Sequence, residues 1–386
     1  MFSSIANVAE LVSAFKVESA MMRYNFFMPR LYNFCRSLGF ERGKIMPSRA
    51  FCSDENQGYP IILIAKHFGT FPFNHGRVGG VLSSNRHGPH AAHGEDYVII
   101  QASHVGYDPG SGRFGGYRRI HTHDEKFTAS CGKISGVIDW YQSQYDFAKE
   151  NIWLERSDEG LLIRIDNELL HQDVNEGLFL NFDLMVSQSR EGQPVPIHSH
   201  STSKSYEVSP WLLRFLKEES WPAEGCRRIG SLLSAELFEF RRRLVENQKE
   251  SNVLEQNLIK AMPWIVTSSA PLLTGAKINT LVEFDRSFRT ILKSDSYRGK
   301  RVVYIAGLHI DISPHAAETF PVTKFVPWAA YVQSRDNSYR ILEQEELVKV
   351  LKAQDDHNPD QIDLEAVIQT MAETDEIKIE IPEPKS

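Results

Sequence analysis

A short stretch decides the fold, and it reads Tyr97-Val98-Ile99-Ile100-Gln101-Ala102-Ser103-His104. Its first six residues are rich in β-branched side chains and follow the loop Gly94-Glu95-Asp96, a pattern that is typical of a buried strand. We therefore expect His104 to lie just past the carboxyl end of that strand. Open α/β sheets bind their ligands beyond the carboxyl ends of strands, so a site is expected there.

A helix is predicted farther along the chain, beginning at Ser130-Cys131-Gly132. Its apolar residues recur at intervals of three and four, at Ile134, Val137, Ile138 and Tyr141. Cys131 is thereby placed at the helix N-terminus, where unpaired backbone N–H groups lower the pKa of a thiol. This edge of the sheet is expected to hold both His104 and Cys131.

Cys52, which is followed by Ser53 and Asp54, completes a set of metal-binding side chains. Two cysteines and a histidine suit zinc, because this ion prefers thiolate and imidazole ligands, and Asp54 adds an orienting carboxylate. Three protein ligands leave a fourth position for water, as in hydrolytic or hydrating enzymes. The wide spacing requires a folded domain to bring the ligands together. Taken singly, each residue is more often a buried cysteine, a loop cap or a satisfied histidine.

The rest of the chain predicts an α/β fold with a mostly parallel sheet flanked by helices. We expect helices at residues 5–38, 60–69, 226–247, 342–351 and 364–371, and strands at 151–155, 161–165, 177–186, 301–312 and 325–332. The segment 60–69 also fits a buried strand, although its proline and glycine ends favour a helix. The sheet is expected to continue to about residue 190. We predict that the chain is divided into three regions. Residues 1–220 hold the zinc-binding site, residues 221–355 form an added C-terminal α+β region, and residues 356–386 form an acidic helix and tail.

The amino-acid composition excludes several classes of protein. The 386 residues carry a net charge of −7, with 41% hydrophobic and 24% charged residues, as in ordinary globular proteins. The sequence has no strong basic character of the kind that indicates nucleic-acid binding. It also has no long apolar stretch of the kind that indicates membrane insertion or a secretion signal. Four cysteines without regular spacing do not form a disulfide framework, which favours a reducing compartment and predicts a cytoplasmic location.

Four blocks of sequence, in this order, resemble the limiting CO2-inducible protein B/C family, a group related to β-class carbonic anhydrases. They are Phe51-Cys52-Ser53-Asp54-Glu55, Arg77-Val78-Gly79-Gly80-Val81, Ser103-His104-Val105-Gly106-Tyr107-Asp108 and Ala129-Ser130-Cys131-Gly132. The resemblance covers roughly residues 25–165 and implies a β-carbonic-anhydrase-like fold. It implies zinc held by Cys52, His104 and Cys131, with Asp54 as the carboxylate of a catalytic dyad, and it implies a homodimer.

The arginine that would partner Asp54 is harder to place, because residues 54–65 contain none. Arg77 is the first candidate, with Arg86 and Arg113 behind it. Such an arginine would keep Asp54 ionised and beside the metal. A rotation of Asp54 onto the metal as fourth ligand would close the site instead.

The resulting prediction is a zinc-dependent carbonic anhydrase that interconverts carbon dioxide and bicarbonate. A first alternative is a catalytically weak or inactive zinc protein that binds inorganic carbon or acts as a scaffold. A second alternative is a zinc hydrolase for a larger substrate, with the C-terminal half closing over the site.

Other motifs favour ordinary roles. His87, His90 and His93 are interpreted as a polar surface loop, with proton transfer as the alternative. The pairs His121/His123 and His198/His200 have the alternation of a strand but lack a third ligand, which makes them weak metal signals. The glycines of residues 106–116 predict a turn, since no Lys-Ser/Thr ending follows to bind phosphate.

Overall fold

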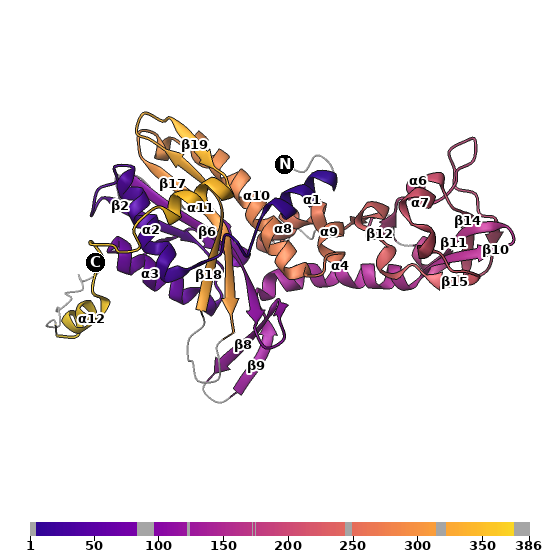
Figure 1. Ribbon diagram of the computed structural model, residues 1–386, viewed down its shortest axis with the longest axis horizontal. Coiled ribbons are helices and arrows are strands. Elements are labelled where there is room, and N and C mark those ends of the chain that lie inside the picture. The colour runs from indigo at the N-terminus through magenta and orange to yellow at the C-terminus, as the bar shows by residue number, and fades with distance from the viewer. Residues whose placement is uncertain are drawn as a thin grey trace, which may run out of the picture.

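The computed structural model describes residues 5–82, 96–121, 124–171, 173, 175–243, 249–313 and 322–373. Its central sheet has eight strands, with β1, β18, β17, β6, β2 and β3 in that order, β19 beside β18 and β7 beside β6. Strands β2, β6, β17, β18 and β19 of this sheet are labelled in Figure 1. Their bounds are β1 Met22–Arg23, β2 Ile45–Ala50, β3 Phe73–Asn74, β6 Asp96–Asp108, β7 Arg113–Phe114, β17 Val302–Ile312, β18 Val322–Gln333 and β19 Tyr339–Leu342.

The centre of this sheet is parallel, because β17, β6, β2 and β3 pair in parallel while the outer strands pair in antiparallel fashion. The α/β class is thus confirmed. Strand β6 is paired on both sides and buried, which explains its continuous apolar run. It extends six residues beyond the predicted end at Ala102, because Ser103 to Tyr107 continue to pair with β17. His104 therefore lies inside the strand, and its predicted place past the strand end was wrong.

Helices cover both faces of the sheet. Side chains of α2 (Tyr24–Ser37), α3 (Gly58–Phe68) and α11 (Gln344–Lys352) pack on one face, and those of α10 (Pro271–Lys293) pack on the other. The helix favoured for residues 60–69 is confirmed as α3. The single helix expected over 5–38 is instead interrupted after α1 (Ile5–Ala14), because β1 pairs with the edge of β18 before α2 begins.

Helix α4 (Gly132–Glu150) connects the central sheet to an outer lobe (Figure 1). The lobe holds an antiparallel sheet in the order β13-β14-β11-β10-β15, so the central sheet does not continue to residue 190 as expected. The strands are β10 Ile152–Ser157, β11 Gly160–Asp166, β13 His198–Ser199, β14 Ser203–Glu207 and β15 Gly225–Arg228, joined by α5 Asn167–Leu170, α6 Phe182–Met185 and α7 Pro210–Phe215.

The helix predicted for residues 226–247 does not form over residues 226–243, and the last four positions lie outside the described residues. Its residues instead enter β15, two short 3-10 turns at Gly230–Leu232 and Ala235–Leu237, and β16 (Phe238–Arg241), which pairs with β12 (Gly177–Leu180). The apolar residues are buried all the same, at Ile229, Leu233 and Leu237. The spacing of these apolar residues indicated burial and not a helix, because short strands and irregular segments bury them equally well.

The C-terminal part of the chain returns to the central sheet through α8 (Lys249–Leu258), α9 (Met262–Val266) and α10. The sheet thus draws strands from both sides of residue 220, and the three-region division stays a prediction. Helix α12 (Leu364–Glu373) follows as expected. A hairpin of β8 (Gly116–His121) and β9 (Asp124–Ala129) projects from the body (Figure 1). No helix within the described ranges is long and apolar enough to cross a membrane.

Candidate metal centre

Cys52 is buried in the loop that follows β2, and a glycine loop fixes its sulfur. The N–H of Gly79 donates a hydrogen bond to Cys52 Sγ at 3.2 Å. Gly79 and Gly80 both have positive φ values, at 78° and 75°, which glycine adopts without strain. A Cβ on Gly80 would also lie 2.1 Å from the carbonyl oxygen of Ala102. The glycines of the second sequence block therefore let the loop lie against β6 and reach Cys52.

A buried amide holds this loop in place from α10. Asn279 Nδ2 donates to the carbonyl oxygen of Gly79 at 2.9 Å and to Ser103 Oγ at 2.8 Å. Asn257 in turn donates to Asn279 and to the buried carboxylate of Glu283, which also accepts from the N–H of Leu82. The two ends of the loop are thus anchored to one network.

His104 is fully buried in the middle of β6. Its Nδ1 lies 2.8 Å from Asp311 Oδ2 on the neighbouring strand β17. Its Nε2 is also buried and has no hydrogen-bond partner within the described part of the chain. Buried polar atoms are rarely left unpaired, so Nε2 is available to a ligand.

Cys131 is the N-cap residue of α4, where the sequence placed it. The preceding residue, Ser130, is tied into the sheet region, since its carbonyl accepts from Gly106 at 2.8 Å and its N–H donates to Gly115 at 3.0 Å. A Cβ on Gly106 would come within 2.7 Å of the carbonyl oxygen of Gly116. The sequence predicted a turn for this segment, and Gly106 serves close packing inside β6 instead.

Together these segments bring Cys52, His104 and Cys131 into one buried cluster. The two Sγ atoms lie 3.8 Å apart, and all candidate ligand atoms lie within 4.8 Å of one another. No other group of three such side chains occurs in the ranges that the structure describes. Two thiols and an unpaired imidazole nitrogen suit a tetrahedral ion that prefers sulfur and nitrogen, such as zinc. The residues present therefore fit a metal ion.

The electrostatics of the cluster favour a thiolate. The pKa of Cys52 is lowered to about 3, chiefly because its sulfur accepts a hydrogen bond from Cys131. The pKa of Cys131 is raised by that same bond and by burial, which outweigh the lowering expected from its helix position. Burial alone would lower the pKa of His104, but the negative charge shared by the coupled thiol pair and the bond to Asp311 raise it above its usual value. Cys52 therefore carries the negative charge of the pair.

The predicted dyad residues Asp54 and Arg77 do not belong to the group of ligand atoms. Asp54 accepts a hydrogen bond from the N–H of Asn56 at 3.2 Å and caps the 3-10 turn Glu55–Gln57. Its carboxylate is outside the group of ligand atoms described above. Arg77 is partly exposed in β4 (Gly76–Arg77), and Arg113 is exposed in β7. Arg86 lies outside the described residues. The roles of Asp54 and Arg77 stay predictions.

The other histidine motifs of the sequence do not contribute to this cluster in the described residues. His87, His90, His93 and His123 lie outside the described residues. His198 and His200 stand side by side with ring centroids 6.2 Å apart, and His198 contacts the exposed carboxylate of Glu159 at 2.6 Å. Because no third ligand joins them within the described ranges, they do not form a metal group.

Sequence reasoning missed Asp311, the partner of His104. A signal was present, because His309 and Asp311 are polar residues at alternate positions of the otherwise apolar strand β17. Such residues share one face of the strand, and burial requires them to find partners. The strand was predicted from its apolar residues, and these two were overlooked.

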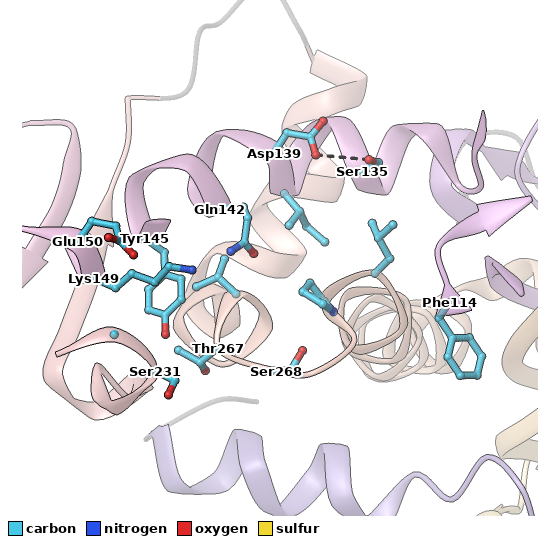
Figure 2. Close-up of a pocket in the computed structure, with 15 residues that line it drawn as sticks. Phe114, Ser135, Asp139, Gln142, Tyr145, Lys149, Glu150, Ser231, Thr267 and Ser268 are labelled. Carbon is cyan, nitrogen blue, oxygen red and sulfur yellow. Dashed lines mark hydrogen bonds between the residues drawn. The ribbon is translucent and has the colours of Figure 1, made fainter. Parts of the chain in front are cut away.

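A separate surface pocket of about 690 Å³ lies along α4 (Figure 2). Gln142 of α4 lies on the side that faces Thr267 and Ser268, whereas Asp139 accepts a hydrogen bond from Ser135 of the same helix. None of the three cluster residues lines this pocket. The candidate metal centre and the surface pocket are therefore separate sites.

Comparison with solved structures agrees with the fold. A crystal structure of PtLCIB4, described as a homolog of the limiting CO2-inducible protein LCIB, matches 88% of this chain and 99% of its own, with a TM-score of 0.50 and 10% identity. A point mutant of PtLCIB4 matches 88% of this chain and 98% of its own, with a TM-score of 0.51 and 11% identity. No protein-family model and no curated protein matches the chain. At this identity the likeness establishes a shared fold, and it confirms the resemblance at that level.

Proposed function

We propose that this protein is a zinc-dependent carbonic anhydrase that interconverts carbon dioxide and bicarbonate. The observation that carries the proposal is the buried Cys52, His104 and Cys131 cluster with an unpaired His104 Nε2. The LCIB-like fold supports it, because the fold is shared with PtLCIB4, a homolog of the limiting CO2-inducible protein LCIB. A zinc ion held there would act as a Lewis acid and lower the pKa of a water at its open position.

The chain's own residues prepare this site. The Gly79 N–H stabilises negative charge on Cys52, and the start of α4 does the same for Cys131 when both thiols are deprotonated. Asp311 orients the imidazole of His104. Burial of the three ligands keeps bulk water from competing for them. We assign Asp54 and Arg77 as the orienting dyad on the strength of the sequence resemblance.

Exchange of 18O between carbon dioxide and water, with zinc quantified on the same samples, tests this function. Wild-type protein is expected to hold about one zinc per chain and to accelerate exchange above background. Cys131→Ser should lose zinc and exchange together. Cys226→Ser is the matched control, since Cys226 is exposed and far from the cluster in sequence, and it should retain both. Wild-type protein that holds zinc but shows only background exchange from pH 6 to pH 9 would overturn the proposal.

A second candidate is a zinc protein that binds inorganic carbon without turning it over. It is favoured by one observation, namely that Asp54 is already engaged as the cap of the 3-10 turn Glu55–Gln57. Calorimetric titration with bicarbonate would then show binding while exchange stays at background. Exchange that disappears in Cys52→Ser contradicts this candidate. The homodimer stays an expectation from the resemblance, and sedimentation velocity measures it.

A further inference from the structure

A chain of buried hydrogen bonds begins at His104 and ends at Tyr24. Asp311 bonds His104 Nδ1 through Oδ2 at 2.8 Å, and Gln57 Nε2 lies 3.2 Å and 3.1 Å from the two Asp311 oxygens. Gln57 Oε1 contacts His309 Nδ1, and His309 Nε2 lies 3.2 Å from the hydroxyl of Tyr24. All five side chains are buried. The chain joins elements that are far apart in sequence, including α2, the 3-10 turn and the two central strands.

The chemistry of the groups fixes the direction of every bond. A carboxylate only accepts, so His104 must carry its hydrogen on Nδ1 and Gln57 must present its NH2 group to Asp311. Gln57 Oε1 then faces His309 and only accepts, so His309 carries its hydrogen on Nδ1 as well. His309 Nε2 is left to accept from the Tyr24 hydroxyl. Thr323 Oγ1 adds a third donor to Asp311, at 3.0 Å.

The surroundings of His309, near the Tyr24 end of this hydrogen-bond chain, maintain the bond directions given above. His309 is enclosed by the rings of Tyr24, Phe51 and Phe325. Burial lowers the pKa of His309 well below its usual value, so its ring is neutral and has one hydrogen to place. The Gln57 oxygen takes that hydrogen. Gln57 is thereby prevented from turning its oxygen toward Asp311.

We propose that Asp311 and Gln57 are positioning residues that hold His104 in its Nδ1–H tautomer, so that Nε2 faces the two thiols as a metal ligand. The inference rests on the metal site of the proposed function and is independent of carbon dioxide hydration. A neutral imidazole binds a metal only through the nitrogen without hydrogen. The tautomer therefore decides whether His104 is a ligand.

Asp311→Asn tests the proposal because an amide cannot accept on both sides. If the new NH2 group faces His104, Nδ1 must accept and Nε2 takes the hydrogen, which blocks metal binding. If the NH2 group faces Gln57 instead, two NH2 groups oppose each other. A second substitution, Gln57→Glu, resolves that conflict, because the new carboxylate accepts both from the amide introduced at position 311 and from His309. The pair moves the negative charge by one residue without changing the net charge.

Zinc affinity is measured by competition with a chromophoric chelator. The tautomer of His104 is measured by 1H–15N correlation of labelled imidazoles in protein stripped of metal, at a pH above the raised pKa of His104, where its ring is neutral. We expect Asp311→Asn to bind zinc about 10- to 100-fold more weakly and to shift the His104 pattern toward the Nε2–H tautomer. Adding Gln57→Glu to Asp311→Asn should recover most of the affinity and the Nδ1–H pattern. Asp96→Asn is the control, since Asp96 is a buried carboxylate at the other end of β6 whose contacts are Arg301 and Arg335.

These measurements distinguish a role of Asp311 in positioning His104 from a general contribution of a buried carboxylate to stability. Asp96→Asn should lower the melting temperature while its zinc affinity stays within about twofold of wild type. The proposal is overturned if Asp311→Asn behaves in the same way, if Gln57→Glu brings no recovery, or if wild-type protein binds no metal. Zinc binding that follows these expectations without any hydration activity would leave the inference standing and remove the proposed function.

Discussion

The sulfur atoms of Cys52 and Cys131 lie 3.8 Å apart, although 79 positions separate the two residues in the sequence. Each comes from a different kind of element, a loop after a strand and the first residue of a helix. A disulfide requires about 2.05 Å between sulfurs, so a movement of under 2 Å would join them. Any metal at the centre must therefore also keep the thiols apart.

This proximity predicts that the thiol pair is protected by zinc. Protein stripped of metal and treated with diamide should form a Cys52–Cys131 disulfide, as the thiols lose two hydrogens and the diamide is reduced to its hydrazine. Zinc added before diamide should suppress the product. Peptide mapping by mass spectrometry detects it, and Cys35, which is buried without a neighbouring thiol in the described structure, should stay unmodified. Equal oxidation with and without zinc would contradict the metal assignment.

Gly80→Ala should be much more damaging than Gly43→Ala. Both glycines have φ near 75°, so both substitutions incur the strain of a left-handed backbone, about 1–2 kcal/mol. Only at position 80 does the added Cβ meet backbone, 2.1 Å from the oxygen of Ala102, whereas nothing lies within 4 Å at position 43. We expect Gly80→Ala to lose about 3 kcal/mol or more in the free energy of unfolding and to lose zinc. Urea unfolding and zinc analysis check both, and similar losses in the two variants would disagree with the packing described.

Asn279→Ala should lower the free energy of unfolding by about 2–3 kcal/mol, because it leaves the Gly79 carbonyl and Ser103 hydroxyl without their buried donor. Zinc affinity should fall as well, since Gly79 also bonds Cys52. Asn33→Ala is the control. Asn33 likewise donates to two oxygens, the carbonyls of Asp355 and His357, but at an exposed position where water replaces it for about 0.5 kcal/mol. Equal losses by chemical denaturation would count against the buried network.

Stability should fall in weak acid partly through His67. Burial lowers the pKa of His67 from 6.5 to about 4, and its Nδ1 accepts from Asn358 Nδ2 at 3.2 Å. Between pH 6.5 and pH 4 the unfolded chain binds a proton that the folded protein excludes, so stability is lost as the pH falls through this window. The loss from pH 8 to pH 5 should be about 2 kcal/mol larger for wild type than for His67→Gln. His309 contributes equally to both proteins, so parallel pH profiles would show that His67 is not responsible.

Much of the layout was accessible from sequence because local patterns and final burial agreed. The apolar runs of β17 and β18 and the helices α3, α4, α11 and α12 were predicted within a few residues, whereas β6 was predicted to within one residue at its start but six residues short at its end. Cys52, His104 and Cys131 were grouped on ligand chemistry before any geometry was known. These segments have one dominant signal each, either continuous burial between paired strands or a single apolar face.

The remainder depended on partners that local sequence does not name. Residues 226–247 have helical apolar spacing, yet Tyr145 of α4 bonds the carbonyl of Leu233, and β15 pairs with β10. The end of β6 is set by β17, which is far away in the chain. Asp311 is separated from His104 by 207 positions, so no spacing rule connects them.

The position of β17 between β6 and β18 has a consequence for how the protein matures. A nascent chain that ends near residue 300 already contains Cys52, His104 and Cys131 but lacks the strand that carries Asp311. Until that strand is inserted, β6 has an open edge and the imidazole of His104 is free to rotate. A metal ion at this centre is therefore expected to be bound only at the last stage of biogenesis, by an almost finished protein.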